Sequence, residues 1–280
     1  MLNIDMTMAR ALRIVTEAHP RQEVFVCGDV RMTNRQVLSE VESTVRSLHA
    51  RSVGKGDRVV ALLPAGSEFA RLFFATAWLG AVFVPLSPDL QEHSLGSIVE
   101  DCEPRLVLRP GELELVGTGP LPSDEGEPGN LVALLYTSGT TGKPKATMHT
   151  HRSLIAPLLA TLKVRAAWTR PSSLRVAAEA VRALSRYGTR LLRAMGKPMT
   201  IMSTTGWHTM TGFHVMLQGL LMGDRLVVLP RFHPEDALEI VQRERVAVER
   251  GLHGDLRPHL PGTHDQDALD VVGFHRSLLG

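Results

Sequence analysis

A run of hydroxyl, glycine and lysine residues, YTSGTTGKPKATMHTH from Tyr136 to His151, directly follows the apolar segment LVALL. A loop that leaves the carboxyl end of a buried parallel strand lies where α/β sheets bind ligands. Gly139 and Gly142 allow successive backbone N–H groups to form an anion-binding concavity. Hydroxyl and ammonium groups would add to this concavity at Thr137, Ser138, Thr140, Thr141, Lys143 and Lys145. The run therefore predicts a polyphosphate site, and a solvated turn between strands is the alternative.

Two common nucleotide-binding motifs do not fit this run. The P-loop needs a Gly four residues before Gly-Lys-Ser/Thr, but Thr137 stands at the first Gly position and Pro144 at the hydroxyl position. The dinucleotide fingerprint fails as well, and GKGDRV at Gly54 lacks its third glycine. Any phosphate loop here is of another type.

Histidines in and after this run do not predict a metal site. His149 and His151 could point the same way on a strand, but no third ligand lies at useful spacing. The stretch from Thr150 to Ser153 instead predicts the start of a helix. Tight ligand spacing is also absent among the histidines near the C-terminus, which are His253, His259, His264 and His275.

The composition of the chain limits its class. Its 280 residues, 44% of them apolar, can form one large domain or two modest ones. A net charge of +2 gives no argument for a nucleic-acid partner. Cys27 and Cys102 match no metal or redox spacing, which favours a reducing compartment. The longest apolar run, FFATAWLGAVFVPL, is too short for the roughly 20 residues that span a bilayer. With no signal-peptide pattern at the start, we expect a soluble, cytoplasmic protein.

Apolar patterns predict the elements that must position the run. Helical spacing over residues 7–18 precedes EVFVCGDVRM, which predicts two strands that turn at Gly28. Thr33 and Gln36 match a capping box before a helix with an apolar stripe. Further strands are expected at RVVALLP, AVFVPL, RLVLR and LVALLYT, and Ser67 is expected to cap the helix after the first of these. Residues 110–130 are rich in Pro, Gly and acids and predict a surface loop.

The second half of the chain continues this alternation. MTIMST and RLVVLP predict strands, TGFHVMLQGLLM and residues 234–245 predict helices, and VAV opens another strand. The whole pattern predicts an α/β fold of mainly parallel β-sheets flanked by helices. Beyond residue 248 neither periodicity continues.

Residues 161–197 are strongly basic, with nine Lys or Arg against the single acid Glu179. A helix over 172–195 would place leucines on one face and arginines on the other. It could make a weak contact with an anionic membrane surface, or pack on its own domain with a solvated arginine face. The absence of aromatic anchors on the apolar face favours packing.

YTSGTTGKPK closely resembles the signature loop of the adenylate-forming, or AMP-binding, superfamily, which includes acyl-CoA synthetases, peptide-synthetase adenylation domains and luciferases. The resemblance extends upstream through RMTNRQVLSEV, GKGDRVVALLP and DCEPRLVL, and downstream through TTGWHTMTGFHVMLQGLLMGDRLVVLP. It covers roughly residues 7–248 and implies the N-terminal domain of such an enzyme.

The resemblance implies an ATP-dependent acid–thiol ligase. Such enzymes form an acyl-adenylate and pyrophosphate from a carboxylic acid and ATP, and a thiol, usually that of coenzyme A, then displaces AMP. By position, residues Thr137–Gly142 with Lys143 and Lys145 would hold the β- and γ-phosphates, and Thr137 would contact Mg²⁺.

The acyl pocket is implied at Trp207, His208, Gly212 and Phe213, with His208 as the catalytic candidate that orients the carboxylate or closes the pocket. A partly buried structural histidine is the alternative. Gly206 stands where the family commonly has Pro, which leaves the local turn open. Because GWHTMTGFH lacks the Asp with which peptide synthetases pair the substrate amino group, a fatty or aryl acid is expected.

Several family motifs are not found after residue 248: the acid that binds Mg²⁺, the ribose-binding Asp and the C-terminal lid with its Lys. We therefore expect a partial AMP-binding domain over 1–248, a divergent tail over 249–280 from a frameshifted or prematurely ended reading frame, and no lid domain. The alternatives are a non-catalytic nucleotide-binding module and a degenerate truncated product that does not fold stably. Acid identity, the thiol acceptor, the oligomeric state, and whether the truncated chain folds or turns over stay open.

Overall fold

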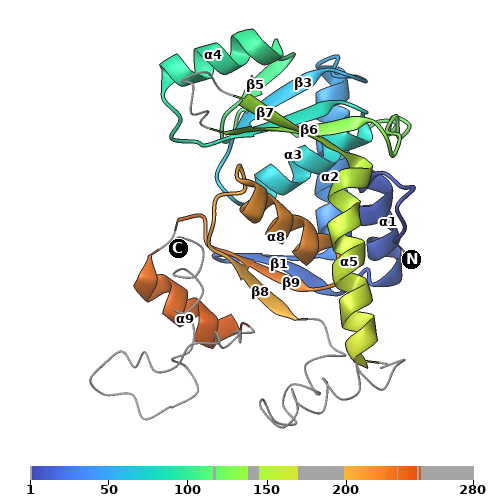
Figure 1. Cartoon of the computed structure of the whole chain (residues 1–280), viewed down its shortest axis with the longest axis vertical. Coiled ribbons are helices and arrows are strands. Elements are labelled where there is room, and N and C mark those ends of the chain that lie inside the picture. The colour runs from blue at the N-terminus through green and yellow to red at the C-terminus, as the bar shows by residue number, and fades with distance from the viewer. Residues whose placement is uncertain are drawn as a thin grey trace.

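The computed structural model describes residues 2–115, 118–137, 145–169, 199–231, 233–244 and 246, and they form an α/β fold with two β-sheets (Figure 1). The strand order is β2-β1-β9-β8 in the four-stranded sheet and β5-β3-β4-β6-β7 in the five-stranded sheet. Most neighbouring strands are parallel, and one antiparallel pair lies at an edge of each sheet. The predicted fold class is confirmed.

The four-stranded sheet joins segments from both ends of the described chain. It contains β1 (Glu23–Cys27), β2 (Val30–Thr33), β8 (Thr200–Ser203) and β9 (Arg225–Val228). β1 and β2 form an antiparallel hairpin, and β9 pairs in parallel with both β1 and β8. The hairpin turns at Gly28, whose φ of 58° lies in the left-handed region that glycine tolerates, so the predicted turn is confirmed.

The five-stranded sheet holds the strand that leads into the signature loop. It contains β3 (Arg58–Leu62), β4 (Val82–Leu86), β5 (Leu106–Leu108), β6 (Leu131–Thr137) and β7 (Lys145–Thr150). β3, β4, β5 and β6 are parallel, so their carboxyl ends share one edge of the sheet, whereas β7 returns antiparallel to β6. The predicted surface loop over 110–130 precedes β6 and contains no helix or strand among its described residues.

Helices cover and separate the two sheets. They are α1 (Met8–Ala18), α2 (Asn34–Ala50), α3 (Ser67–Trp78), α4 (Glu92–Cys102), α5 (His151–Thr169), α8 (Met210–Leu221) and α9 (Pro234–Glu244). Figure 1 shows α3 and α8 between the sheets and α5 running past the edges of both. None of the helices described combines the length and the apolar composition that crossing a membrane requires.

The starts of α2 and α3 show where the local sequence was sufficient to predict the N-terminus of a helix and where it was not. The Thr33 hydroxyl accepts a hydrogen bond from the Gln36 N–H, and the Gln36 side chain accepts one from the Thr33 N–H, so the capping box of α2 is confirmed. The expected cap at Ser67 is wrong. Ser67 is the first residue of α3, Gly66 is the N-cap, and no side chain caps this end.

An aromatic cluster fills the space between the sheets. It is formed by Phe69 and Phe73 of α3, Phe83 of β4, Phe213 of α8, and Trp207. All five side chains are at most 1% exposed. Most of the ring pairs meet edge to face, such as Phe73–Phe213 at a centroid distance of 4.9 Å, whereas Phe83 and Phe213 are stacked. The core therefore crosses from one sheet to the other.

Some expectations fall on residues that the structure does not describe. These are residues 138–144 of the signature loop, the basic helix over 172–195, most of the VAV strand and the tail over 249–280. The helix expected over 234–245 is found as α9, with residue 245 outside the described residues.

Candidate active site

The ends of β6 and β7 mark where the signature loop begins and ends. Thr137 is the last residue of β6 and pairs with Lys145, the first residue of β7. The Lys145 side chain is exposed, and of Thr137 only the backbone is described. The residues between them that were predicted to bind phosphate lie outside the described residues: Ser138, Gly139, Thr140, Thr141, Gly142 and Lys143. The structure thus fixes both ends of the loop at the carboxyl edge of the parallel strands.

The last turn of α4 holds the end of β6 in place. The Tyr136 hydroxyl donates a hydrogen bond of 2.5 Å to Oδ2 of Asp101. Burial, and then this hydrogen bond, raise the pKa of the Tyr136 phenol, so it stays a neutral donor. The Thr147 hydroxyl donates to the Leu135 carbonyl across the hairpin at 3.2 Å. These contacts fix the last residues of β6 before Thr137.

The far end of β7 passes directly into α5. The Thr150 hydroxyl accepts a hydrogen bond from the Ser153 N–H at 3.1 Å, which confirms the predicted helix start. His151 is buried, and its Nδ1 accepts a hydrogen bond from the Met8 N–H at 3.0 Å. His149 lies 3.0 Å from the Thr147 hydroxyl. Nowhere in the described part of the chain do three or more His, Cys, Asp or Glu side chains gather as a metal site would require.

The predicted acyl-pocket segment follows β8 of the other sheet. Trp207 is fully buried, and its indole N–H donates to the Ser203 hydroxyl at 2.8 Å. Phe213 is also fully buried and contacts Phe73 and Phe69. The structure therefore places these two rings in the aromatic cluster behind the segment.

Gly212 lies where α8 meets the turn before it. The Thr209 hydroxyl caps α8 by accepting from the Gly212 N–H at 3.2 Å. A Cβ added at Gly212 would lie 2.4 Å from the Gly206 carbonyl oxygen, so only glycine fits this approach. Packing alone therefore requires glycine at position 212, independently of any substrate.

His208 lies between the carboxyl ends of the two sheets. Burial lowers the pKa of its imidazole, and the negative charge of Asp89 opposes this shift. Asp89 follows β4 of the five-stranded sheet, whereas His208 follows β8 of the four-stranded sheet. The His208 ring is therefore mainly neutral near pH 7 and able to accept a hydrogen bond.

Asp89 and Ser203 were not predicted as site residues. For Asp89 a signal was present, because SPDL follows an apolar parallel strand at the edge where ligands bind. The Ser203–Trp207 contact gave no such signal, because it depends on the turn after β8. Sequence reasoning therefore finds loops at strand ends more readily than the residues that support them.

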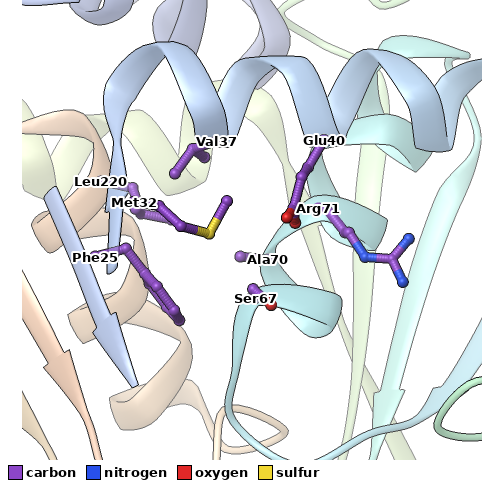
Figure 2. Close-up of a pocket in the computed structure, with 8 residues that line it drawn as sticks. All are labelled: Phe25, Met32, Val37, Glu40, Ser67, Ala70, Arg71 and Leu220. Carbon is purple, nitrogen blue, oxygen red and sulfur yellow. The ribbon is translucent and has the colours of Figure 1, made fainter. Parts of the chain in front are cut away.

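A separate hollow lies between α2, α3, α8 and the β1–β2 hairpin (Figure 2). The centre of a water-sized sphere can occupy about 10 Å³ of it, and its walls are mainly apolar apart from Glu40, Ser67 and Arg71. No predicted site residue that the structure describes lines it. We therefore treat it as a packing defect apart from the candidate site.

Comparison with known proteins identifies the class that this fold and site define. A family described as AMP-binding enzyme matches residues 12–249, which is most of the chain. The chain belongs to the AMP-binding enzyme family.

Similar curated proteins include several CoA ligases. Long-chain-fatty-acid–CoA ligase FadD13 of Mycobacterium tuberculosis is 31% identical over 174 residues, which cover 51% of this chain and 35% of that protein. Feruloyl-CoA synthase of an Amycolatopsis species is 35% identical over 147 residues, covering 45% and 30%. 3-Hydroxybenzoate–CoA/4-hydroxybenzoate–CoA ligase of Thauera aromatica is 28% identical over 169 residues, covering 48% and 32%. The matches span about a third of the length of these relatives.

Solved structures agree with the fold. The inhibitor-bound N-terminal domain of FACL13 from Mycobacterium tuberculosis superposes with a TM-score of 0.68 at 22% identity, covering 86% of this chain and 62% of that one. The N-terminal subdomain of NpsA from Klebsiella oxytoca, in complex with 3-hydroxyanthranilyl-AMSN, gives a TM-score of 0.65 at 16% identity, covering 86% and 58%. At these identities the likeness establishes the fold alone.

Proposed function

We propose that this protein is an ATP-dependent acyl-CoA ligase. A carboxylate attacks the α-phosphorus of ATP, the bond to the β-phosphate oxygen breaks, and an acyl-adenylate and pyrophosphate form. The thiol of coenzyme A then displaces AMP and gives the thioester. Membership of the AMP-binding family over residues 12–249 carries the proposal, and the position of Thr137 and Lys145 at the two ends of the signature loop supports it.

The loop residues act through charge and hydrogen bonds. Lys145, with Lys143 and the hydroxyl and N–H groups of Thr137–Gly142, neutralises the charge that develops on leaving pyrophosphate. The fixed ends of β6 and β7 support this role, because stabilisation of developing charge requires donors that are already in place. When bound with ATP, Mg²⁺ would supply further neutralisation of the phosphates, and Thr137 would be its protein contact.

The acid is a fatty or aryl carboxylate without an α-amino group. The segment from Gly206 to His214 contains no acid that could pair with an ammonium group. The similar curated ligases are named for long-chain fatty, hydroxybenzoic and ferulic acids, which also lack one. His208 is neutral near pH 7 and faces the carboxylate, while Trp207 and Phe213 fix the wall behind it.

Pyrophosphate exchange tests the proposal directly. The 280-residue protein is incubated with ATP, Mg²⁺, labelled pyrophosphate and a panel of fatty and aryl acids, and formation of labelled ATP is followed. We expect acid-dependent exchange that falls by about 10²-fold in Lys145→Ala, the size of effect seen on removing one charge-stabilising donor. Addition of coenzyme A then gives the thioester.

Lys163→Ala is the matched control, because Lys163 is exposed on α5, 18 residues further along the chain, and has no proposed role. It should leave exchange unchanged. Saturable ATP binding without exchange for any acid would contradict the ligase and favour a non-catalytic nucleotide-binding module.

A further inference from the structure

The imidazole of His208 lies directly against the backbone of Gly206. A Cβ placed on Gly206 would lie 2.4 Å from Cε1 of His208, 2.8 Å from Nδ1 and 3.4 Å from Nε2. Separations below 3.0 Å are not compatible with a real Cβ, so the ring occupies the space that any side chain at residue 206 would need. The position of the ring depends on residue 206 being glycine.

The backbone of Gly206 cannot move away from the ring. Its carbonyl oxygen accepts two hydrogen bonds from Thr209, from the N–H at 3.1 Å and from the hydroxyl at 2.8 Å. The same carbonyl packs against Gly212 on the first turn of α8. On the next residue, the fully buried Trp207 side chain is held by Ser203. A side chain at position 206 must therefore displace the His208 ring.

The glycine is not required by its own backbone conformation. Gly206 is not among the glycines with positive φ, so alanine could adopt its backbone angles. The steric clash of a Cβ at this position is then with the His208 ring, because the three atoms nearest to that Cβ all belong to the ring. Gly212 differs, since a Cβ there would meet backbone atoms that cannot rotate away.

We infer that Gly206 is a positioning residue for His208. Because it has no side chain, Gly206 lets the imidazole pack against the turn after β8, at the junction between the two sheets. Its importance for turnover rests on the role proposed above for His208. With the imidazole packed against Gly206, its position is set by the backbone of the turn, which α8 holds in place. A larger residue at position 206 moves the ring and leaves the turn in place.

A double-mutant cycle in the full chain tests this coupling. The variants are Gly206→Ala, His208→Ala and the double variant, and the measurements are Tm and the NMR pH titration of the His208 ring, assigned by its loss in His208→Ala. We expect Gly206→Ala to lower Tm by about 2–4 °C and to move the titration midpoint of His208 up toward 6.5, because displacement relieves burial. In the His208→Ala background the same substitution should leave Tm unchanged.

Gly129→Ala serves as control, because a Cβ at Gly129 meets open space and its φ is not positive. An equal loss of Tm in both backgrounds, or an unshifted titration in Gly206→Ala, would overturn the inference. If Gly206→Ala does not fold, folding of the double variant still supports the coupling, and failure of both overturns it.

Pyrophosphate exchange adds a functional readout. Gly206→Ala should raise the KM for the acid while the KM for ATP stays the same, since the His208 ring moves and the ends of β6 and β7 at Thr137 and Lys145 do not. An unchanged KM for the acid in an active enzyme would contradict the positioning role. Because the Tm cycle and the titration need no turnover, absence of exchange in the wild type would count against the ligase and not against the coupling.

Discussion

His151 is a buried histidine that joins two helices. Its Nδ1 accepts the hydrogen bond of the Met8 N–H, the first N–H of α1, and His151 is itself the first residue of α5. Burial lowers the pKa of its imidazole to about 4. A proton on Nδ1 would remove the acceptor and add positive charge beside two helix N-termini, where cations are disfavoured.

Replacing His151 tests its effect on acid stability. Above pH ~6.5 the residue is neutral in both folded and unfolded chains. Between pH ~6.5 and 4 the unfolded chain binds the proton and the folded chain does not. The free energy of unfolding therefore decreases by about 3 kcal/mol in total as the pH is lowered over this range. His151→Asn keeps an acceptor near the Nδ1 position and cannot titrate, so it should flatten this pH dependence.

Urea unfolding at pH values from 7 to 4 measures the change. His93→Asn is the control, because His93 is exposed on α4 and makes no such contact. An unaltered slope in His151→Asn would show that other groups cause the acid loss.

Helix α2 packs against α3 and the β1–β2 hairpin with one imperfect region. Val37 and Glu40 face the hollow shown in Figure 2, where Met32 and Ala70 form part of the opposite wall. One turn further along the helix, Val41 is fully buried and is not part of the lining. Two valines on one apolar stripe therefore differ in the space around them.

Adding one methylene at each valine distinguishes these surroundings. Val37→Ile should raise the free energy of unfolding by up to about 0.8 kcal/mol, because the new group enters empty space. Val41→Ile should lower it by about 1–3 kcal/mol, because a filled core must be displaced. Urea denaturation measures both, and a change of the same sign in the two variants would contradict the difference in packing.

Elements were predictable from the sequence where their signals are local. The Thr33–Gln36 capping box and the Gly28 turn each depend on residues within a few positions of one another. The cap expected at Ser67 failed because Gly66 ends the turn after β3 and already leads into α3. An offset of one residue at a helix start is not resolved by residue preference alone.

At the scale of the whole molecule, the candidate site depends on contacts between distant segments. His208 follows β8 and Asp89 follows β4, and the aromatic cluster joins Trp207 to Phe69 across 138 positions of sequence. Patterns along the chain predicted the strands but not their division into two sheets, because β1 pairs with β9 across most of the described chain. The packing behind His208 therefore could not be derived from residue spacing.

Helix α5 connects the two sheets through an ion pair between a partly exposed Arg165 and a buried Asp224. It begins directly after β7 of the five-stranded sheet, and its Arg165 donates two hydrogen bonds to Asp224, at 3.0 and 2.7 Å. Asp224 immediately precedes β9 of the four-stranded sheet, and its side chain is 1% exposed. The Asp224 carboxylate also accepts the Met199 N–H at 3.0 Å, so it fixes the approach to β8 as well.

Breaking this pair should destabilise the whole molecule. Arg165→Met leaves the Asp224 carboxylate buried without its guanidinium partner and should lower the free energy of unfolding by about 3–5 kcal/mol. Arg152→Met is a matched control on the same helix, because Arg152 also lies 2.7 Å from a carboxylate, that of Asp5, but this pair is exposed and should cost at most about 1 kcal/mol.

A double variant separates the effect of the unpaired Asp224 carboxylate from the effect of lost arginine packing. In Arg165→Met/Asp224→Asn the buried charge is absent and the amide can still accept the Met199 N–H, so part of the lost stability should return. Urea unfolding of the three variants at pH 7 measures these differences. Equal losses in Arg165→Met and Arg152→Met would show that this ion pair contributes no more than an exposed pair. No recovery in the double variant would show that the lost packing of Arg165, and not the unpaired Asp224 carboxylate, causes the loss.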